Sequence, residues 1–391
     1  MQNPIINPTV LVSPVEDGYV AYDPVSDRLH QLNPIAAILA ELCDGTRSVE
    51  DLRNLVAPIL PEGKTSEIDR WIDDGLKVGL IKWKGSETAS YRELTAAELF
   101  DLAKRLRMKG AMQTAYLCGK RAADLEPTDT DMSYVLGDLA LSVGRRGEAR
   151  AAYQKYFDLS PDDAEIDHLL IALRDETPPP RASNRTIQQI YKGFSSSYET
   201  RMVDDLRYRG PEHLRTAIKL VFQDEPRNLN ILDLGCGTGL AGVFLKPWSS
   251  CLAGIDLSPE MIELARARGI YDRFEVAEIT TWLERTSECF DLIVSLDCLI
   301  YFGDLERIVT AVAKRLNPGG VFALSMERGA VNPFRLTDTG RYEHHPDHVR
   351  EVAARAGLAV GHLNEAFLRM EYYVEVIGLY AVLKKLATAE G

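Results

Sequence analysis

The stretch Ile231–Gly242, which reads ILDLGCGTGLAG, decides the fold of the C-terminal half of the chain. It joins an apolar run to a loop with several glycines, and two glycine patterns overlap in that loop. Gly237–Gly242 reads GxGxxG, the turn of dinucleotide-binding units, whereas Asp233–Gly239 reads DxGxGxG. Glycine allows a tight turn and a close approach of backbone to ligand, so either pattern predicts a nucleotide site after a strand. The flanking residues must decide between the two patterns.

Apolar runs and helical patterns alternate from about residue 190 onward. This alternation is typical of a parallel sheet that is covered by helices on both faces. The expected strands are 228–234, 251–255, 273–277, 290–296 and 320–325. Asp256, Glu278 and Asp297 follow the second, third and fourth of these strands. Because strand ends meet at the ligand crevice of such a sheet, we expect these three carboxylates at one site.

Three features favour DxGxGxG, the loop associated with S-adenosylmethionine, over the turn of the hydride-carrying dinucleotides. Asp233 precedes the first glycine by two residues, where a carboxylate favours binding of the positively charged methionine end of S-adenosylmethionine. Glu278 stands where an acidic group reaches the adenine amine, and Asn317–Gly320 forms a tight turn into the fifth strand. Asp256 does not discriminate, since a carboxylate there accepts hydrogen bonds from the ribose hydroxyls of either nucleotide. The loop is therefore interpreted as a methyl-donor site.

Four motifs follow one another with the order and spacing of a known family. They are ILDLGCGTGL, GIDLSPEMIELAR, FDLIVSLDCLIYFGDL and LNPGGVFALSME. On these motifs, residues 187–388 resemble the class I S-adenosylmethionine-dependent methyltransferases. The resemblance implies a Rossmann-like α/β domain that uses S-adenosylmethionine as methyl donor and releases S-adenosylhomocysteine. Positioning of the acceptor in line with the leaving sulfur supplies much of the acceleration in such a reaction.

The resemblance also carries the family's donor-binding roles onto matching positions of this chain. The residues expected to bind the donor are Tyr191, Asp233, Gly235, Cys236, Gly237, Gly239, Asp256, Leu257, Glu278, Ile279 and Asp297. In this set Asp256 would bind the ribose, and Glu278 with Ile279 would frame the adenine. Tyr191 has an equal alternative, which is packing against the edge of the sheet.

A second set of residues is expected near the methyl acceptor. It comprises Tyr198, Asp297, Arg341, His344 and His345. A carboxylate acceptor needs no base and is favoured by a nearby arginine, whereas an amine, phenol or imidazole often needs a proton acceptor. The two histidines have an alternative at the solvated start of a helix, and no metal site is expected because a further ligand at matching spacing is missing. A late strand is expected over 367–376, on which Arg369 and Glu371 pair with each other or face the cleft.

The N-terminal part of the chain has a different pattern. Short β-prone runs at 10–13, 18–23 and 28–32 precede three helical patterns, which predicts a small winged-helix-like α+β module over residues 8–85. Its markers are Leu32-Asn33, Asp44-Gly45-Thr46 and Glu50-Asp51. On these markers the block resembles the PqqD-type fold, the recognition element that holds leader peptides of ribosomally synthesised natural products.

That resemblance implies a precursor peptide as partner, whose leader adds a strand to the edge of the N-terminal hairpin. Other enzymes of a biosynthetic complex are further possible partners. A winged-helix DNA binder and a purely structural cap are the alternatives. The block has no cluster of Lys or Arg to meet phosphates, so nucleic acid is not an expected partner.

An internal repeat occupies the middle of the chain. Leu125-Glu-Pro127 recurs as Leu159-Ser-Pro161, and the two prolines are 34 positions apart. This period resembles tetratricopeptide repeats, which implies an all-α segment over residues 92–176 that stacks helix pairs. We expect it to serve as a spacer or docking shelf, with an independent peptide-binding surface as the alternative. Residues 177–186, rich in proline, are expected to form a stiff, exposed linker.

Composition limits the remaining possibilities. The chain has 391 residues, a formal net charge of −13 and six cysteines without a CxxC pair. An acidic surface of that size disfavours binding to nucleic acid, and unpaired thiols are typical of a reducing cytosol. The sequence shows neither a secretory signal nor an apolar run long enough for a membrane span, so we expect a cytoplasmic location without a membrane partner.

Together these patterns predict a multidomain methyltransferase that acts on a precursor peptide, by O-methylation of a carboxylate or by N-methylation. One alternative is a methyltransferase for a small molecule, whose upstream modules only dock it to a biosynthetic complex. The other is a non-catalytic peptide-binding chaperone. The intact loop glycines and Asp256 favour the enzymatic hypotheses.

Overall fold

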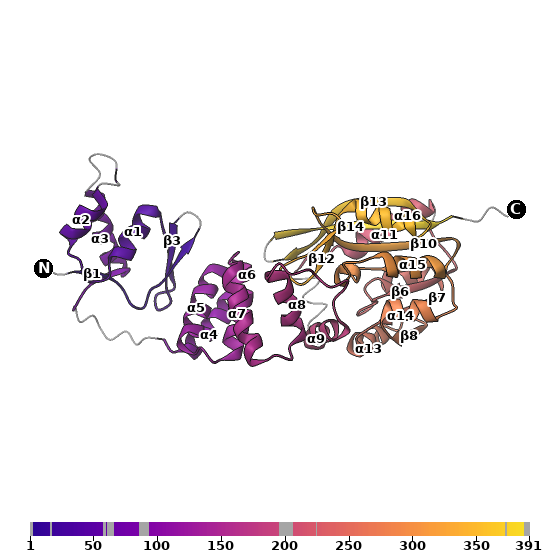
Figure 1. The fold of residues 1–391 in the computed structure, drawn as a ribbon, viewed down its shortest axis with the longest axis horizontal. Helices are drawn as coiled ribbons and strands as arrows, with labels where there is room; N and C mark the ends of the chain where they lie inside the picture. Colours follow the sequence, from indigo (N-terminus) through magenta and orange to yellow (C-terminus); the bar gives the residue numbers. More distant parts are fainter. Residues whose placement is uncertain are drawn as a thin grey trace. The chain divides into compact units, whose positions relative to one another are not determined.

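A computed structural model describes residues 3–15, 18–57, 60, 66–85, 94–194, 206–223, 225–371 and 374–386. The chain divides into two compact units, Met1–Ser160 and Pro161–Gly391 (Figure 1). Each unit has its own secondary structure and is described by itself. Among the described residues, no helix is both long and apolar enough to cross a membrane.

The first unit begins with a small α+β module. Its strands are β1 (Pro4–Ile6), β2 (Leu11–Val15), β3 (Gly18–Asp23), β4 (Arg28–Leu32) and β5 (Ile81–Trp83), and its helices are α1 (Pro34–Leu42), α2 (Val49–Val56) and α3 (Ser66–Val78). The antiparallel sheet has the order β2-β3-β4, and β1 pairs separately with β5. Asn33 caps α1, and Ser48 with Asp51 forms a capping box on α2, so the sequence markers of this block fix where its helices begin.

The module is followed by helices that pack in consecutive pairs. They are α4 (Ala96–Met108), α5 (Met112–Leu125), α6 (Thr130–Ser142) and α7 (Arg146–Leu159). Gly110 and Gly144 adopt φ of 77° and 75° just after α4 and α6, at equivalent positions of the two pairs. A left-handed residue ends a helix at little cost only when it is glycine, so the two turns are built alike.

The second unit is built on a nine-stranded sheet. The strands are β6 (Leu229–Leu234), β7 (Ser249–Asp256), β8 (Arg273–Val276), β9 (Phe290–Ser295), β10 (Leu316–Arg328), β11 (Phe334–Leu336), β12 (Tyr342–His344), β13 (Leu358–Glu371) and β14 (Val374–Lys385). The first five pair in parallel in the order β10-β9-β6-β7-β8, while β14 runs antiparallel beside β10 and pairs with β13. The five predicted strands thus correspond to β6–β10, and the Rossmann-like fold of this half is confirmed.

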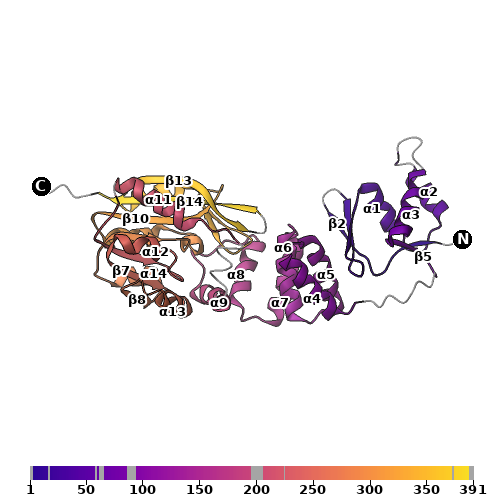
Figure 2. The same ribbon diagram turned by 180° about the vertical axis from the view of Figure 1, so that it is seen from behind.

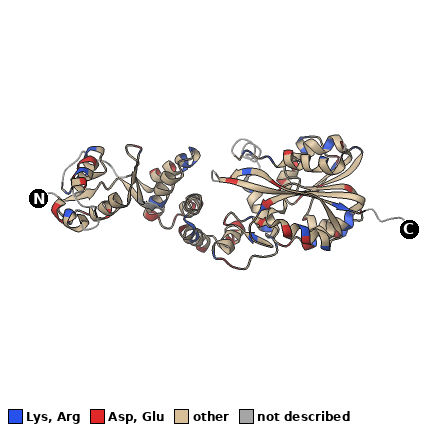
Figure 3. Ribbon diagram, turned by 90° about the horizontal axis from the view of Figure 1, so that it is seen from above, with Lys and Arg blue, Asp and Glu red and all other residues tan. Residues whose placement is uncertain are grey.

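Helices cover both faces of this sheet, which Figure 3 shows edge-on between two helical layers, with acidic and basic residues interspersed along the helices. The helices are α8 (Ala164–Leu173), α9 (Asn184–Phe194), α11 (Gly210–Phe222), α12 (Gly242–Leu245), α13 (Pro259–Ala267), α14 (Ile279–Arg285), α15 (Glu306–Arg315) and α16 (Pro346–Arg355). In β6, Leu232 packs in the cluster that contains α14, α15 and α16, whereas its neighbour Ile231 packs in the cluster with α11, α12 and α13. Successive residues of a strand point to opposite faces, so the continuous apolar run of β6 serves both layers. Figure 2 shows the fold from behind, with α11, α12 and α13 labelled.

One prediction about connections was wrong. The expected single strand 367–376 is the end of β13 and the start of β14, because an alternating pattern does not reveal where a long hairpin reverses. The segment 177–186 was expected to be an exposed linker, and residues 177, 180 and 183–185 are exposed, but part of it is hydrogen-bonded to the rest of the second unit. The carbonyl of Pro180 accepts hydrogen bonds from the backbone N–H groups of Gly303 and Asp304 at 2.8 and 2.9 Å. These main-chain bonds fix a segment whose prolines cannot form a helix or a central strand of their own.

Candidate active site

The glycine loop after β6 folds back against the end of β7. The backbone N–H groups of Gly235 and Cys236 donate to the carbonyl of Ile255 at 2.8 and 3.0 Å. Gly235 and Gly237 have φ of 70° and 52°, a region that side chains other than glycine rarely adopt. A Cβ on Gly235 would lie 2.3 Å from Sγ of Cys298, whereas a Cβ on Gly237 would meet nothing within 4 Å. Gly235 is therefore required by the packing against Cys298, whereas Gly237 leaves open space above the loop.

Asp256, the last residue of β7, holds the loop from the other side. Its Oδ2 accepts a hydrogen bond from the backbone N–H of Gly237 at 2.8 Å, and its Oδ1 accepts one from Ser258 at 2.9 Å. Burial raises the pKa of Asp256, and these N–H groups act in the opposite direction. Each carboxylate oxygen keeps acceptor capacity for a ligand beyond these single bonds.

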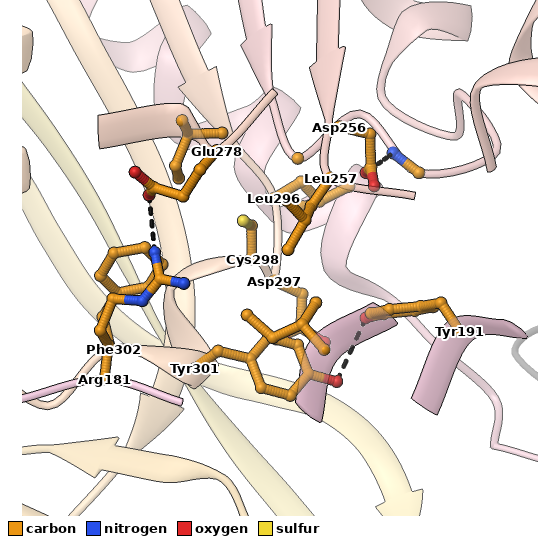
Figure 4. A pocket seen from close by; sticks show the side chains of 14 residues that line it. Arg181, Tyr191, Asp256, Leu257, Glu278, Leu296, Asp297, Cys298, Tyr301 and Phe302 are labelled. Atoms are coloured by element: carbon orange, nitrogen blue, oxygen red, sulfur yellow. Dashed lines mark hydrogen bonds and ion pairs between the residues drawn. The ribbon is translucent and has the colours of Figure 1, made fainter. Parts of the chain in front are cut away.

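A pocket opens at this end of the sheet, with about 600 Å³ of empty space in and in front of it, open solvent included. Its lining residues are Arg181, Ile187, Tyr191, Gly235, Gly237, Asp256, Leu257, Glu278, Ile279, Leu296, Asp297, Cys298, Tyr301 and Phe302 (Figure 4). Most of the expected donor-binding residues are brought together here. A concave, mainly apolar site with a few fixed polar groups is typical of small-ligand binding.

Three of the residues expected to bind the donor are buried and do not line the pocket. Asp233 is 0% exposed, and its Oδ2 accepts a hydrogen bond from the Tyr271 hydroxyl at 2.6 Å. Burial raises the pKa of Asp233 to about 7. Cys236 is buried in the same layer, and Gly239 turns the chain toward α12 with φ of 88°. Asp233 thus supports the loop through its buried contacts.

Asp297 belongs to a cluster of buried charges at the wall of the pocket. Nη1 of Arg369 lies 3.2 Å from Oδ2 of Asp297, and Nη2 of Arg369 pairs with Glu327 and, at 3.4 Å, with Glu371. Nη1 of Arg341 lies 2.5 Å from Glu371 and 3.9 Å from Glu327. Two arginines and three carboxylates leave this cluster with one formal negative charge. The expected pairing of Arg369 with Glu371 is present, but it is one contact of a larger network.

Two other expected acceptor residues, His344 and His345, do not line the pocket. His344 is completely buried, with its Nε2 2.8 Å from the carbonyl of Phe302 and its Nδ1 3.2 Å from Nδ1 of His348. Burial lowers the pKa of His344 to about 3. His345 caps α16 by accepting a hydrogen bond from the backbone N–H of Asp347, which is the helix-start alternative. Tyr198, the remaining expected residue, lies outside the described residues. Within the described ranges, no group of three or more His, Cys, Asp or Glu side chains is arranged to hold a metal ion.

The pocket also contains residues that the sequence did not single out. Arg181, Ile187, Leu296, Tyr301 and Phe302 are lining residues of this kind. Tyr301 and Phe302 follow the fourth strand within the quoted family motif, so position in the motif was a signal for them. Arg181 offered none, because it follows three prolines in a segment typical of linkers.

The residues present fit S-adenosylmethionine. Open space lies above Gly237, where a ligand can approach the backbone, and the carboxylate of Asp256 stands beside it. Leu257, Ile279 and Phe302 supply apolar surface in the same pocket. A carboxylate for ribose hydroxyls beside apolar walls for a purine matches the chemistry of a nucleoside.

Comparison with known proteins agrees with this assignment. Residues 231–320 match a family model described as a methyltransferase domain. Three similar curated proteins are a ubiquinone biosynthesis O-methyltransferase from Xanthomonas axonopodis (27% identical, 33% of this chain and 57% of the relative), a malonyl-[acyl-carrier protein] O-methyltransferase from Acetivibrio thermocellus (33% identical, 28% and 40%), and a trans-aconitate 2-methyltransferase from Paracidovorax citrulli (31% identical, 32% and 45%). The chain spans about half the length of these relatives. It therefore contains a methyltransferase domain of the S-adenosylmethionine-dependent, class I kind.

Proposed function

We propose that this chain transfers the methyl group of S-adenosylmethionine to a ribosomally synthesised precursor peptide. One observation supports the donor half above all: the DxGxGxG loop and Asp256 meet at the pocket, with the Gly237 N–H 2.8 Å from the Asp256 carboxylate. When bound, S-adenosylmethionine supplies an electrophilic methyl group. Asp256 would hold its ribose, and the open backbone at Gly237 would lie against its methionine end.

Asp297 is the residue best placed to receive a proton at this site. Its Oδ2 is held by Arg369, and its Oδ1 has no hydrogen-bond partner among the described residues. Burial raises the pKa of Asp297, and the charge of Arg369 counteracts this shift. A fixed carboxylate with one oxygen to spare would accept a hydrogen bond from an N–H or O–H group of the acceptor.

The charge cluster also bears on which acceptor is favoured. A carboxylate acceptor would need an arginine to hold it, but Arg369 and Arg341 already contact three carboxylates between them. The cluster has a formal charge of −1, which repels a second anion. N-methylation is therefore favoured over O-methylation of a carboxylate.

The peptide half of the proposal draws on the N-terminal module. Strand β4 lies at the edge of the sheet β2-β3-β4, and within the described ranges no further strand pairs with it. An edge of this kind offers free main-chain groups to an added strand. Leu29 on β4 is 53% exposed, so its side chain is accessible to a peptide that adds to this edge. A leader bound there would raise the local concentration of its core at the methyl donor, with α4–α7 as the connection.

A matched pair of leucine variants in the full chain tests this proposal. Leu29→Asp would place a charge on the β4 edge, while Leu55→Asp changes a leucine that is equally exposed, at 54%, on α2. The probe is a synthetic peptide encoded by a short reading frame beside the gene. We expect Leu29→Asp to weaken binding of the peptide at least tenfold and to reduce its methylation, with S-adenosylhomocysteine affinity unchanged. Equal behaviour of the two variants would contradict leader binding at β4.

A small-molecule acceptor is the second candidate, and the relatives favour it. A protein named for ubiquinone biosynthesis and one named for trans-aconitate are both among the similar proteins. In that case the upstream modules would only dock the enzyme to a biosynthetic complex. Incubation with labelled S-adenosylmethionine and either candidate peptides or a small-molecule extract, followed by tandem mass spectrometry, separates the two. Label in a small molecule with none in any peptide would favour the second candidate.

A further inference from the structure

The segment Pro179–Ala182 forms part of the wall of the donor pocket. Besides the two hydrogen bonds to the carbonyl of Pro180, the backbone N–H of Ala182 donates to the carbonyl of Tyr301 at 2.8 Å. Arg181 and Phe302 form an antiparallel bridge, and the Tyr342 hydroxyl donates to the carbonyl of Pro179 at 2.7 Å. We refer to Pro179–Ala182 as the strap. Its position is set by main-chain bonds and so does not depend on the side chain of Arg181.

Glu278, on the same side of the pocket, has no acceptor capacity left. Its Oε1 accepts from the backbone N–H of Thr280 at 3.0 Å and lies 2.7 Å from Nη1 of Arg181. Its Oε2 accepts from the backbone N–H and the hydroxyl of Thr281 at 2.8 and 2.6 Å. A carboxylate has about four acceptor positions, and these four donors fill them. Glu278 therefore cannot take the amine of an adenine without losing one of these bonds.

Arg181, in contrast, has donors to spare. Its Nε–H donates to the carbonyl of Ala182 at 2.9 Å, Nη1 pairs with Glu278, and Nη2 donates to Asn184. A guanidinium has five N–H groups, so these partners leave two of them for a ligand. The guanidinium carbon lies 5.2 Å from the ring centre of Phe302, and the side chain is 24% exposed. Figure 4 shows the guanidinium between Glu278 and the interior of the pocket, beside Phe302.

We propose that Arg181 is a donor-binding residue, which gives its two remaining N–H groups to ring nitrogens of the adenine. Glu278 is the positioning residue that holds the guanidinium. The ring nitrogens of adenine are acceptors, which match N–H donors, whereas a carboxylate matches only the adenine amine. The proposal rests on S-adenosylmethionine being the methyl donor, but not on the identity of the acceptor. It assigns a binding role to the segment that connects α8 to α9.

Calorimetric titration of the full chain with S-adenosylhomocysteine tests the assignment. A charge-assisted hydrogen bond in a partly buried site predicts a loss of affinity on the order of ten- to a hundredfold in Arg181→Ala. Glu278→Gln should weaken binding less, since the guanidinium remains. Arg185→Ala is the matched control, because this arginine lies in the first turn of α9, is 65% exposed, and among the described residues contacts Asp162 rather than the pocket. Unchanged affinity in Arg181→Ala would overturn the assignment.

Ligand analogues provide a test that does not depend on how well a variant folds. The 1-deaza, 3-deaza and 7-deaza forms of S-adenosylhomocysteine each replace one ring nitrogen by carbon. In the unaltered protein, at least one of them should bind about tenfold more weakly than S-adenosylhomocysteine. In Arg181→Ala, that analogue and S-adenosylhomocysteine should bind alike. If the same analogue penalty persists in Arg181→Ala, another group contacts the nitrogen and the assignment is wrong.

The two proposals fail in different ways. If the unaltered chain does not bind S-adenosylhomocysteine at all, the proposed methyltransferase function fails, and the role of Arg181 fails with it. If the unaltered chain binds it and Arg181→Ala binds it equally well, only the role of Arg181 fails.

Discussion

Arg369 and Asp297 form a buried ion pair at the wall of the donor pocket, with Nη1 of the arginine 3.2 Å from Oδ2 of the aspartate. The two residues come from β13 and from the end of β9, so the pair connects the antiparallel hairpin to the parallel part of the sheet. The same guanidinium contacts Glu327 and Glu371. This arrangement makes Arg369 the residue on which the whole charge cluster depends.

Replacing Arg369 by methionine should destabilise the second unit strongly. The change leaves three buried carboxylates with only Arg341 to balance them, and loss of one partner of a buried ion pair costs about 3–5 kcal/mol. Denaturant unfolding of the full chain, followed at this unit, measures the loss. Arg350→Met on α16 is the control, because that arginine is 51% exposed and pairs with Asp347 at the surface, so its loss should cost less than about 1 kcal/mol. Equal stability of the two variants would contradict the role of the cluster.

Alanine at two glycines of the loop should separate folding from ligand binding. In Gly235→Ala the new methyl group would lie 2.3 Å from Sγ of Cys298, so we expect a loss of stability of about 2 kcal/mol or more. In Gly237→Ala no protein atom is within 4 Å, and only the strain of a positive φ remains, about 1 kcal/mol. That methyl group would occupy ligand space, so S-adenosylhomocysteine affinity should fall sharply. Thermal unfolding and calorimetric titration report the two effects; intact binding by Gly237→Ala would place the ligand elsewhere.

Asp256→Asn should weaken S-adenosylhomocysteine binding more than tenfold while leaving the fold intact. The amide keeps the shape of the side chain, but one of its ends can no longer accept hydrogen bonds from the loop or from ribose hydroxyls. Glu263→Gln, on α13 and 73% exposed, removes a nearby charge without touching the pocket and should bind normally. Unchanged S-adenosylhomocysteine affinity in Asp256→Asn would show that Asp256 does not hold the ribose.

The buried carboxyl of Asp233 should make the stability of the second unit depend on pH. Burial raises the pKa of Asp233 to about 7, whereas the unfolded chain loses this proton near its ordinary value of 3.8. Between these values the folded protein binds one more proton than the unfolded chain, so the free energy of unfolding falls as pH rises, by at most about 1.4 kcal/mol per pH unit. Above pH 7 this contribution is constant.

Asp233→Asn removes that dependence, and the comparison should be made between pH 4 and pH 8. The unfolding free energy of the variant relative to the unaltered protein should increase with pH up to about 7 and then level off. His344 acts with the opposite sign, since burial lowers its pKa to about 3, but its contribution is common to both proteins and cancels. A constant difference across the range would show that Asp233 is ionised in the folded protein.

The parallel sheet could be predicted from the sequence because the signals for its strands and loops lie in short local stretches. A continuous apolar run such as that of β6, followed by glycines with positive φ, requires a strand and a tight loop whatever surrounds them. The carboxylates at strand ends could be assigned to one site for the same reason. The role of His345 at the start of α16 was likewise among the alternatives that the sequence offered.

The misassigned residues depend on contacts between distant segments. His344 was expected near the acceptor, but β12 pairs with both β10 and β11 and carries this side chain into the interior. Arg181 was placed in a linker, since nothing near it in the sequence indicates the bond between Ala182 and Tyr301. Pairings of that separation are set by the tertiary fold and have no local pattern.

The contacts of the strap limit where the chain can be divided to make a fragment or a chimaera. The family match ends at residues 231 and 320, and a fragment with those limits would lack Arg181 and the hairpin that carries Arg369. Helix α8 also belongs to the second unit, where its His168 lies 3.1 Å from the carbonyl of Gly340. A chimaera that joins the second unit to a different N-terminal module therefore needs its junction near Pro161, between α7 and α8, so that the transplanted unit keeps the wall of its own pocket.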